Sequence, residues 1–137
     1  MRAGIVLLAY IVVARAVIMA TNVPFLAEHG VDVEANPLAR LLMASVGVVQ
    51  VHVACLAACL VVAAIIARIG RSSPAIATAA VIALVVMVTY PLVNDLHVFF
   101  AGASIFTDFA DVVAAVAGTI ALCMAGWWAA GQPTLRF

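Results

Sequence analysis

Hydrophobic residues fill four long stretches of this chain, and polar residues gather in the short segments between them. The stretches run from Gly4 to Leu26, Leu38 to Ala67, Pro74 to Ala101 and Phe106 to Ala130. Within each stretch the apolar residues cover all sides of a helical wheel, whereas a helix of a water-soluble protein has one polar face. A β-barrel strand would alternate apolar and polar residues over about ten positions. We therefore predict an all-α fold with four long helices.

The length and composition of these stretches indicate a membrane protein. A helix needs about 20 apolar residues to cross the hydrocarbon core of a bilayer, and each stretch is long enough. Hydrophobic residues make up 69% of the chain and charged residues 9%, which leaves no segment for a separate water-soluble domain. We predict a single transmembrane domain, residues 1–137, surrounded by a lipid bilayer.

Capping residues and helix breakers agree with these boundaries. Asn36 and Ser73 each directly precede a proline, a pattern that favours a capped helix start with proline at the first helical position. Gly70 and Gly102 are placed to end the second and third helices. Pro91 lies inside the third stretch, where it predicts a kink.

The distribution of charge predicts the orientation. Most of the arginines lie at the two termini and in the second connection, so the positive-inside rule places both termini in the cytoplasm. The acidic residues all lie toward the opposite, outer side. Apart from Arg15, the arginines are Arg2, Arg68, Arg71 and Arg136, with Arg40 alone in the first connection; the acids are Glu28, Asp32, Glu34, Asp95, Asp108 and Asp111.

Arg15 is the one charge that does not lie toward an end of an apolar stretch. It lies about 17 Å along the first helix at 1.5 Å per residue, near the middle of the bilayer. Burying an arginine there costs roughly 2.5–3.5 kcal/mol, so we expect an acidic partner or a polar cavity. Asp95 and Asp111 are the candidate partners. A structural ion pair is the preferred interpretation, and a charge lining an ion or substrate path is the alternative.

The second stretch carries a polar stripe of Ser45, His52, Cys55 and Cys59, whose spacings of seven, three and four place them on one helix face. Imidazole and thiolate are metal ligands, and Cys123 in the last stretch lies at a depth similar to that of Cys59. The spacing matches no metal-binding signature, and cysteine also serves as a small apolar residue. We therefore expect free thiols and neither a metal nor another cofactor.

A second polar face belongs to the third stretch, just beyond Pro91. Tyr90, Asn94 and His97 recur at spacings of four and three, which predicts a polar vestibule, while Asp95 should point elsewhere. Asp108 and Asp111 share a face at the start of the last helix. The positive end of the helix dipole explains these two acids without any bound cation.

The last stretch combines small residues with two tryptophans. Small residues allow close helix approach in lipid, either within the chain or between chains, and we expect internal packing to be the commoner use. The tryptophans are typical interfacial anchors. The small residues are Ala110, Ala114, Ala117, Gly118, Ala121 and Ala125, and the tryptophans are Trp127 and Trp128.

Several function classes lack support. The chain has no phosphate-binding glycine loop, no zinc-protease motif and no nucleophile elbow, so we do not expect an enzyme. A formal net charge of +0 without a basic patch argues against nucleic acid as a partner.

The connection between the first two stretches contains a glycine and then the run Glu-Ala-Asn-Pro-Leu at residues 34–38. This loop resembles the signature of a family of small uncharacterised prokaryotic polytopic membrane proteins. In that family a later helix carries a tyrosine and an asparagine, similar to Tyr90 and Asn94 here. Its members usually have an aspartate in the first helix, where this chain has Arg15. The resemblance spans about residues 14–100 and implies a fold but little chemistry.

Short connections and plain surfaces favour a structural or accessory subunit of a larger membrane assembly. Its partners would be other membrane subunits or further copies of itself, in an energy-conserving complex of a cell membrane or in the internal membrane of a virion. One alternative is a small oligomeric ion channel or transporter that uses Arg15 and His52. A second alternative is a haem- or metal-binding redox protein.

Overall fold

A computed structural model describes the chain except residues 1, 35, 103, 106–107, 132–133 and 136–137, and describes Arg2 and Ala3 by backbone alone. Every regular element of the described residues is a helix. In chain order they are α1 (Arg2–His29), a short 3-10 helix η1 (Val31–Val33), α2 (Pro37–Val46), α3 (Val48–Ile69), α4 (Pro74–Ala101) and α5 (Phe109–Ala129). The prediction of an all-α fold is confirmed.

Four of these helices, α1, α3, α4 and α5, are long and apolar enough to cross a bilayer. The bounds of α4 coincide with the predicted ones. The last helix begins at Phe109, and its predicted start at Phe106 lies outside the described residues. The surfaces of these four helices are thus suited to insertion into a membrane.

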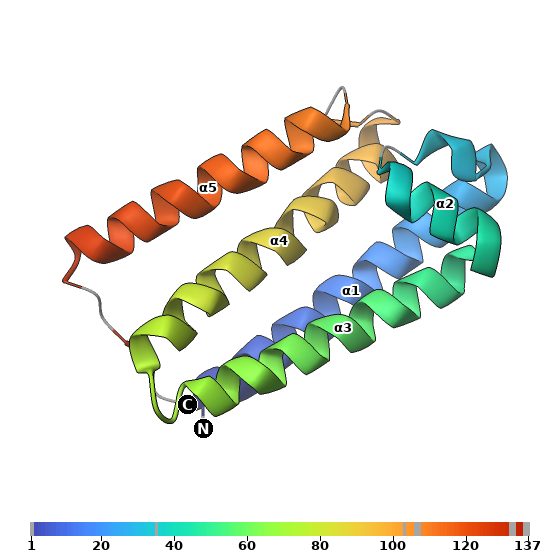
Figure 1. Ribbon diagram of the computed structural model, residues 1–137. Coiled ribbons are helices and arrows are strands. Elements are labelled where there is room, and N and C mark those ends of the chain that lie inside the picture. The colour runs from blue at the N-terminus through green and yellow to red at the C-terminus, as the bar shows by residue number, and fades with distance from the viewer. Residues whose placement is uncertain (1, 35, 103, 106–107, 132–133, 136–137) are drawn as a thin grey trace.

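The helices run up and down, with α1, α3 and α4 packed together and α5 lying along α4 (Figure 1). Ile11 and Ala14 of α1 and Ala77 of α4 are almost completely buried in a core that α3 completes with Ala63 and Ile66. Tyr10 of α1 shares a hydrogen bond with Thr89 of α4. A second apolar cluster lies at the other end of the molecule, under α2.

The stretch predicted as one helix from Leu38 to Ala67 forms two helices, so this boundary prediction was wrong. The chain turns at Gly47, whose φ of 100° and ψ of 150° belong to a region that only glycine adopts at low cost. Hydropathy could not reveal this turn, because the residues on both sides of Gly47 are equally apolar. As a result α2 has only ten residues, too few to cross a bilayer.

The predicted caps are only partly observed. The Asn36 side chain accepts hydrogen bonds from the backbone N–H groups of Leu38 and Ala39, which confirms the start of α2. Ser73 occupies the equivalent position before α4 but makes no such side-chain bond. Gly70 and Gly102 end α3 and α4, as predicted.

At the start of α5 the Asp108 carboxylate accepts a hydrogen bond from the backbone N–H of Asp111, at 2.9 Å. This N-cap agrees with the helix-terminus explanation for the two acids. Pro91 lies inside α4, and the kink there stays a prediction.

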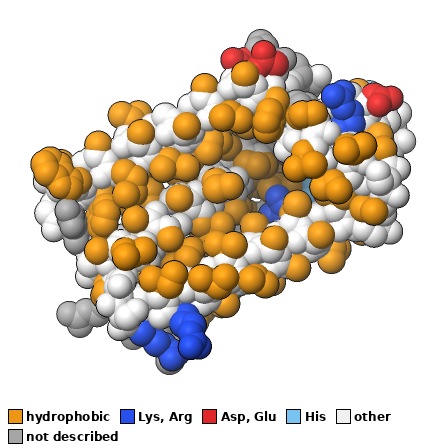
Figure 2. Space-filling view, in the orientation of Figure 1, with side chains coloured by type: hydrophobic (Ala, Val, Ile, Leu, Met, Phe, Trp, Pro, Cys, Tyr) orange, Lys and Arg blue, Asp and Glu red, His pale blue; other side chains and the backbone are white. Residues whose placement is uncertain are grey.

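Charge separates between the two ends of the molecule. Basic side chains gather where α3 ends and α4 begins, at Arg68 and Arg71, and most of the acidic side chains gather at the opposite end (Figure 2). Arg40 is also at the acidic end, where its Nη1 donates to the carbonyl of Asp32. Apolar side chains cover most of the surface between the two ends, as expected for contact with lipid. The cytoplasmic location of both termini remains a prediction from this pattern.

Replacing Gly47 by alanine should lower the free energy of unfolding by about 1–3 kcal/mol, because an L residue is strained at this φ. The added Cβ would also lie 2.4 Å from Oε1 of Gln50, although that flexible side chain can move. The measurement is the thermal unfolding midpoint in detergent. Gly4→Ala is the matched control, since a Cβ there meets no heavy atom within 4 Å. An equal loss of stability in both variants would contradict the conclusion that the positive φ at position 47 requires glycine.

Candidate functional site

A cavity of about 210 Å³ with several polar side chains in a mainly apolar wall lies between the spanning helices, in the half of the molecule that carries the acidic end. The space-filling view shows a hollow between the spanning helices in an otherwise apolar surface (Figure 2). The cavity is far larger than the ~15 Å³ that one water needs. Its polar walls come from four segments: α1 supplies Arg15 and Asn22, α3 supplies His52 and Cys55, α4 supplies Tyr90, Asn94 and Asp95, and the first connection supplies Glu34 and Asn36.

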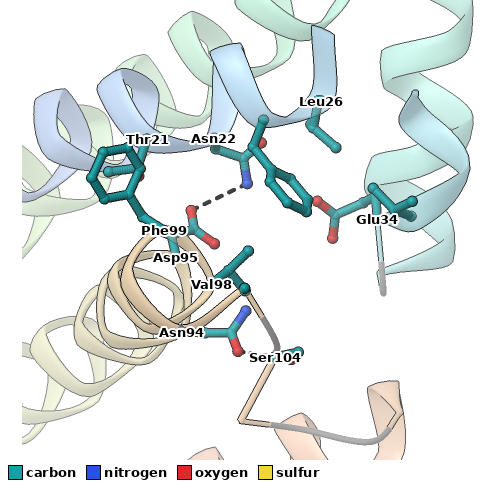
Figure 3. A pocket seen from close by; sticks show the side chains of 12 residues that line it. Thr21, Asn22, Leu26, Glu34, Asn94, Asp95, Val98, Phe99 and Ser104 are labelled. Carbon is teal, nitrogen blue, oxygen red and sulfur yellow. Dashed lines mark hydrogen bonds between the residues drawn. The ribbon is translucent and has the colours of Figure 1, made fainter. Parts of the chain in front are cut away.

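Asn22 links three helices through its side-chain amide. The Nε2–H of His52 on α3 donates to Oδ1 of Asn22 at 3.3 Å, and Nδ2 of Asn22 donates to Oδ2 of Asp95 on α4 at 3.2 Å. Figure 3 shows the bond from Asn22 to Asp95. The amide is suited to this position because it can accept from one neighbour and donate to the other.

Arg15 is only 8% exposed, and its Nε–H has no hydrogen-bond partner among the described residues. It lies seven residues before Asn22, so both side chains occupy the same face of α1. Asp95, one of its two predicted partners, lines the same cavity, whereas Asp111 does not line it. An ion pair of Arg15 with either acid stays a prediction.

His52 is 4% exposed, and its Nδ1 also lacks a partner among the described residues. Since Nε2 carries the proton donated to Asn22, a neutral imidazole presents Nδ1 as an unused acceptor. Two of the most buried polar side chains among the described residues therefore keep hydrogen-bonding capacity beside one cavity. Unsatisfied buried groups of this kind are rare and call for a physical explanation.

A second cavity of about 180 Å³ continues toward the loops and shares Asn22, Glu34, Asn94 and Asp95 with the first. Figure 3 shows these side chains around it. Asn94 is held by the connection to α5, because its Oδ1 accepts from the hydroxyl of Ser104 and the backbone N–H of Ile105. One oxygen of Glu34 accepts from the backbone N–H of Asn36 at 2.9 Å.

The predicted vestibule on α4 has partly different members. Tyr90 and Asn94 line the first cavity, but His97 is exposed and lines neither cavity. Asp95, which we expected to point elsewhere, lines both. Consecutive helical residues are about 100° apart, so Asn94 and Asp95 can both face a space that α1 and the first connection enclose from two sides.

The predicted stripe on the second stretch is divided by Gly47. Ser45 lies on α2, where it is exposed and its hydroxyl donates to the carbonyl of Leu41. Cys55 is exposed and lines the cavity, Cys59 packs against the apolar core, and Cys123 is exposed on α5. Within the described part of the chain, no three His, Cys, Asp or Glu side chains come together as a metal site.

Sequence reasoning missed Asn22, although a signal was present. An amide seven residues after an arginine in an apolar helix predicts one polar face, and the two side chains do share the cavity. Its partners on α3 and α4 could not be read from the sequence, because they depend on how the helices pack.

Asn22→Ala should lower the free energy of unfolding by about 1–3 kcal/mol, because His52 and Asp95 both lose a partner. The thermal unfolding midpoint in detergent measures the loss. Thr21→Ala is the matched control, since the Thr21 hydroxyl donates only to carbonyls of its own helix, at Val17 and Ile18. Similar midpoints for the two variants would show that the bridge contributes no stability.

Comparison of the chain with protein-family models, curated proteins and solved structures gives no match. The resemblance of the first connection to a membrane protein family therefore stays a prediction. The chemistry of the cavity and of the exposed helix faces is what bears on the function of the protein.

Proposed function

We propose that the protein is a small oligomeric transporter or channel that passes a polar solute through the membrane. The observation that carries this proposal is the cavity between apolar helices with Arg15 in its wall, nine-tenths buried and with an unpartnered Nε–H. A purely structural arginine would be expected to have its donors satisfied. A buried ionisable group that is costly and incompletely paired is instead typical of a substrate or ion path.

The shape of the interior favours a gated transporter over an open pore. The two cavities lie toward the acidic end of the molecule. At the other end, packed side chains fill the space between α1, α3 and α4, including Leu7, Ile11 and Leu84. We infer that a solute reaches Arg15 from the acidic side, because the second cavity continues the first toward the loops. Passage to the basic side would require these apolar side chains to separate.

Liposomes containing the protein should pass at least one small polar solute faster than empty liposomes. The probes are chloride, ammonium, acetate, glycine and glycerol, each followed by light scattering after an osmotic step. Arg15→Gln should reduce the rate of the transported solute by about tenfold or more, the effect of losing roughly 1.4 kcal/mol of interaction.

Arg68→Gln serves as the control, because Arg68 is exposed at the opposite end of the molecule from the cavity. His52→Gln provides a second variant of the cavity wall in case Arg15→Gln does not fold. Flux of all five probes at the rate of empty liposomes, or flux unchanged in both wall variants, would contradict the proposal.

A second candidate function, a subunit of a larger membrane assembly, is favoured by the outward face of α5. None of the residues of α5, all of which are described, is buried, and α5 packs mainly along α4. Its predicted small-residue stripe is exposed, and a Cβ added at Gly118 would meet no heavy atom within 4 Å. Internal packing, the use we expected for the stripe, is not observed, so this face is open to another helix.

Native mass spectrometry of the chain from its own membrane separates the two candidates. Copies of this chain alone support the oligomeric transporter, and foreign subunits support the accessory role. Gly118→Leu should weaken either association by about tenfold or more, because a large side chain keeps helices apart. Ala57→Leu on the exposed face of α3 is the size-matched control. A monomeric wild-type chain would contradict both candidates.

A further inference from the structure

The charges around the cavity are arranged along the direction of the helices. The Arg15 cation lies farther from the acidic end of the molecule than the carboxylates of Asp95 and Glu34. Asn22 lies seven residues beyond Arg15, about 10 Å along α1 at 1.5 Å per residue. Asp95 is hydrogen-bonded to Asn22 and therefore lies near that level. Glu34 belongs to the connection beyond the end of α1. A solute in the cavity meets a guanidinium at its inner end and two carboxylates at its outer end.

The inner end lacks a partner of the kind that a guanidinium prefers. The Nε–H of Arg15 is unpaired among the described residues but is enclosed by protein, so a carboxylate in the cavity would accept from the two terminal nitrogens of the guanidinium, in a planar, bidentate contact. His52 adds an unpaired Nδ1 beside the same cavity. The carboxylates at the outer end still have lone pairs beyond those used by Asn22 and by the backbone of Asn36.

The arrangement discriminates between three classes of ligand. A simple anion would satisfy Arg15 but would have to pass and remain near Asp95 and Glu34, which repel it. A simple cation would be attracted to those two acids and would leave Arg15 without an anionic partner. A ligand with a carboxylate at one end and an ammonium at the other satisfies both ends.

We infer that the cavity binds a small zwitterion of the amino acid type, with its carboxylate on Arg15 and its ammonium group facing Asp95 and Glu34. The size of the cavity agrees, since 210 Å³ is below the ~300–1,000 Å³ of pockets that hold drug-sized ligands. This inference names the substrate class of the proposed transport. It rests on the proposed function only for movement of the ligand across the membrane, because binding of the ligand in the cavity does not require transport.

The test is calorimetric binding to the purified full chain in detergent, with three zwitterions of increasing length as probes: glycine, β-alanine and 4-aminobutyrate. Each has a matched acid without the amine (acetate, propionate, butyrate) and a matched amine without the acid (methylamine, ethylamine, propylamine). Phosphate buffer is used, because many common buffers are themselves zwitterions. At least one zwitterion should bind about tenfold or more tightly than its matched acid and amine.

Variants of each end of the cavity show where the zwitterion binds. Arg15→Gln and Asp95→Asn should each weaken its binding by about thirtyfold or more, because each leaves one charge of the ligand unpaired. Arg15→Lys keeps the charge but loses the fork of donors, so its affinity should lie between those of the wild type and Arg15→Gln. Arg68→Gln should bind as the wild type does. The unfolding midpoint of each variant shows whether it is folded, and Arg15→Lys and Asp95→Asn carry the test if Arg15→Gln is not.

Failure of the inference can be distinguished from failure of the proposed function. If no zwitterion binds, or if a matched acid or amine binds as tightly, the zwitterion site is overturned, while flux of another solute would leave transport intact. If a zwitterion binds and Arg15→Lys and Asp95→Asn do not weaken it, the assignment to this cavity is overturned. Zwitterion binding that depends on both residues, without flux in liposomes, would support the site and contradict transport.

Discussion

The structure depends on one constraint: inside hydrocarbon, a polar group has no water to bond and must find its partner within the protein. The backbone meets this requirement by forming helices. Hydroxyl groups meet it locally, as when Thr89 donates to the carbonyl of Val85 one turn earlier in α4. Others meet it between helices, as Tyr90 of α4 does with Thr119 of α5. Most of the polar side chains in the spans therefore strengthen the packing of the bundle.

Arg15 and His52 are the departures from this behaviour. Both are deeply buried, and each keeps a nitrogen that no described residue satisfies. Stability alone would be better served by apolar side chains at these positions, because an incompletely paired charge is costly to bury. Asn22 differs from these two residues, because both the oxygen and the nitrogen of its side-chain amide make hydrogen bonds. The cavity thus combines a wall that Asn22 holds in place with two buried residues whose hydrogen-bonding capacity no described residue uses in full.

The sequence predicted the apolar helices well and the site only in part. Hydropathy and the Asn36 and Gly102 caps located most helix ends to within three residues, because those signals are local; the first helix, for example, was predicted from Gly4 to Leu26 and runs from Arg2 to His29. The turn at Gly47 was missed, since a backbone angle leaves no trace in apolar periodicity. Arg15 and His52 were recognised as polar residues in apolar helices, but the contact of Asn22 with Asp95 joins positions 73 residues apart. Such contacts arise from tertiary packing and have no local pattern.

The turn at Gly47 makes α2 a separate short helix through which the surrounding lipid would act on the cavity wall. Because α2 is too short to span a membrane, its exposed Leu38 and Leu41 are suited to the boundary between headgroups and acyl chains. On its other face, Ala39 and Met43 form part of the cavity wall. A bilayer of different thickness or headgroup packing would shift the depth at which α2 rests. The membrane that holds the protein would therefore act on the wall of the cavity through α2.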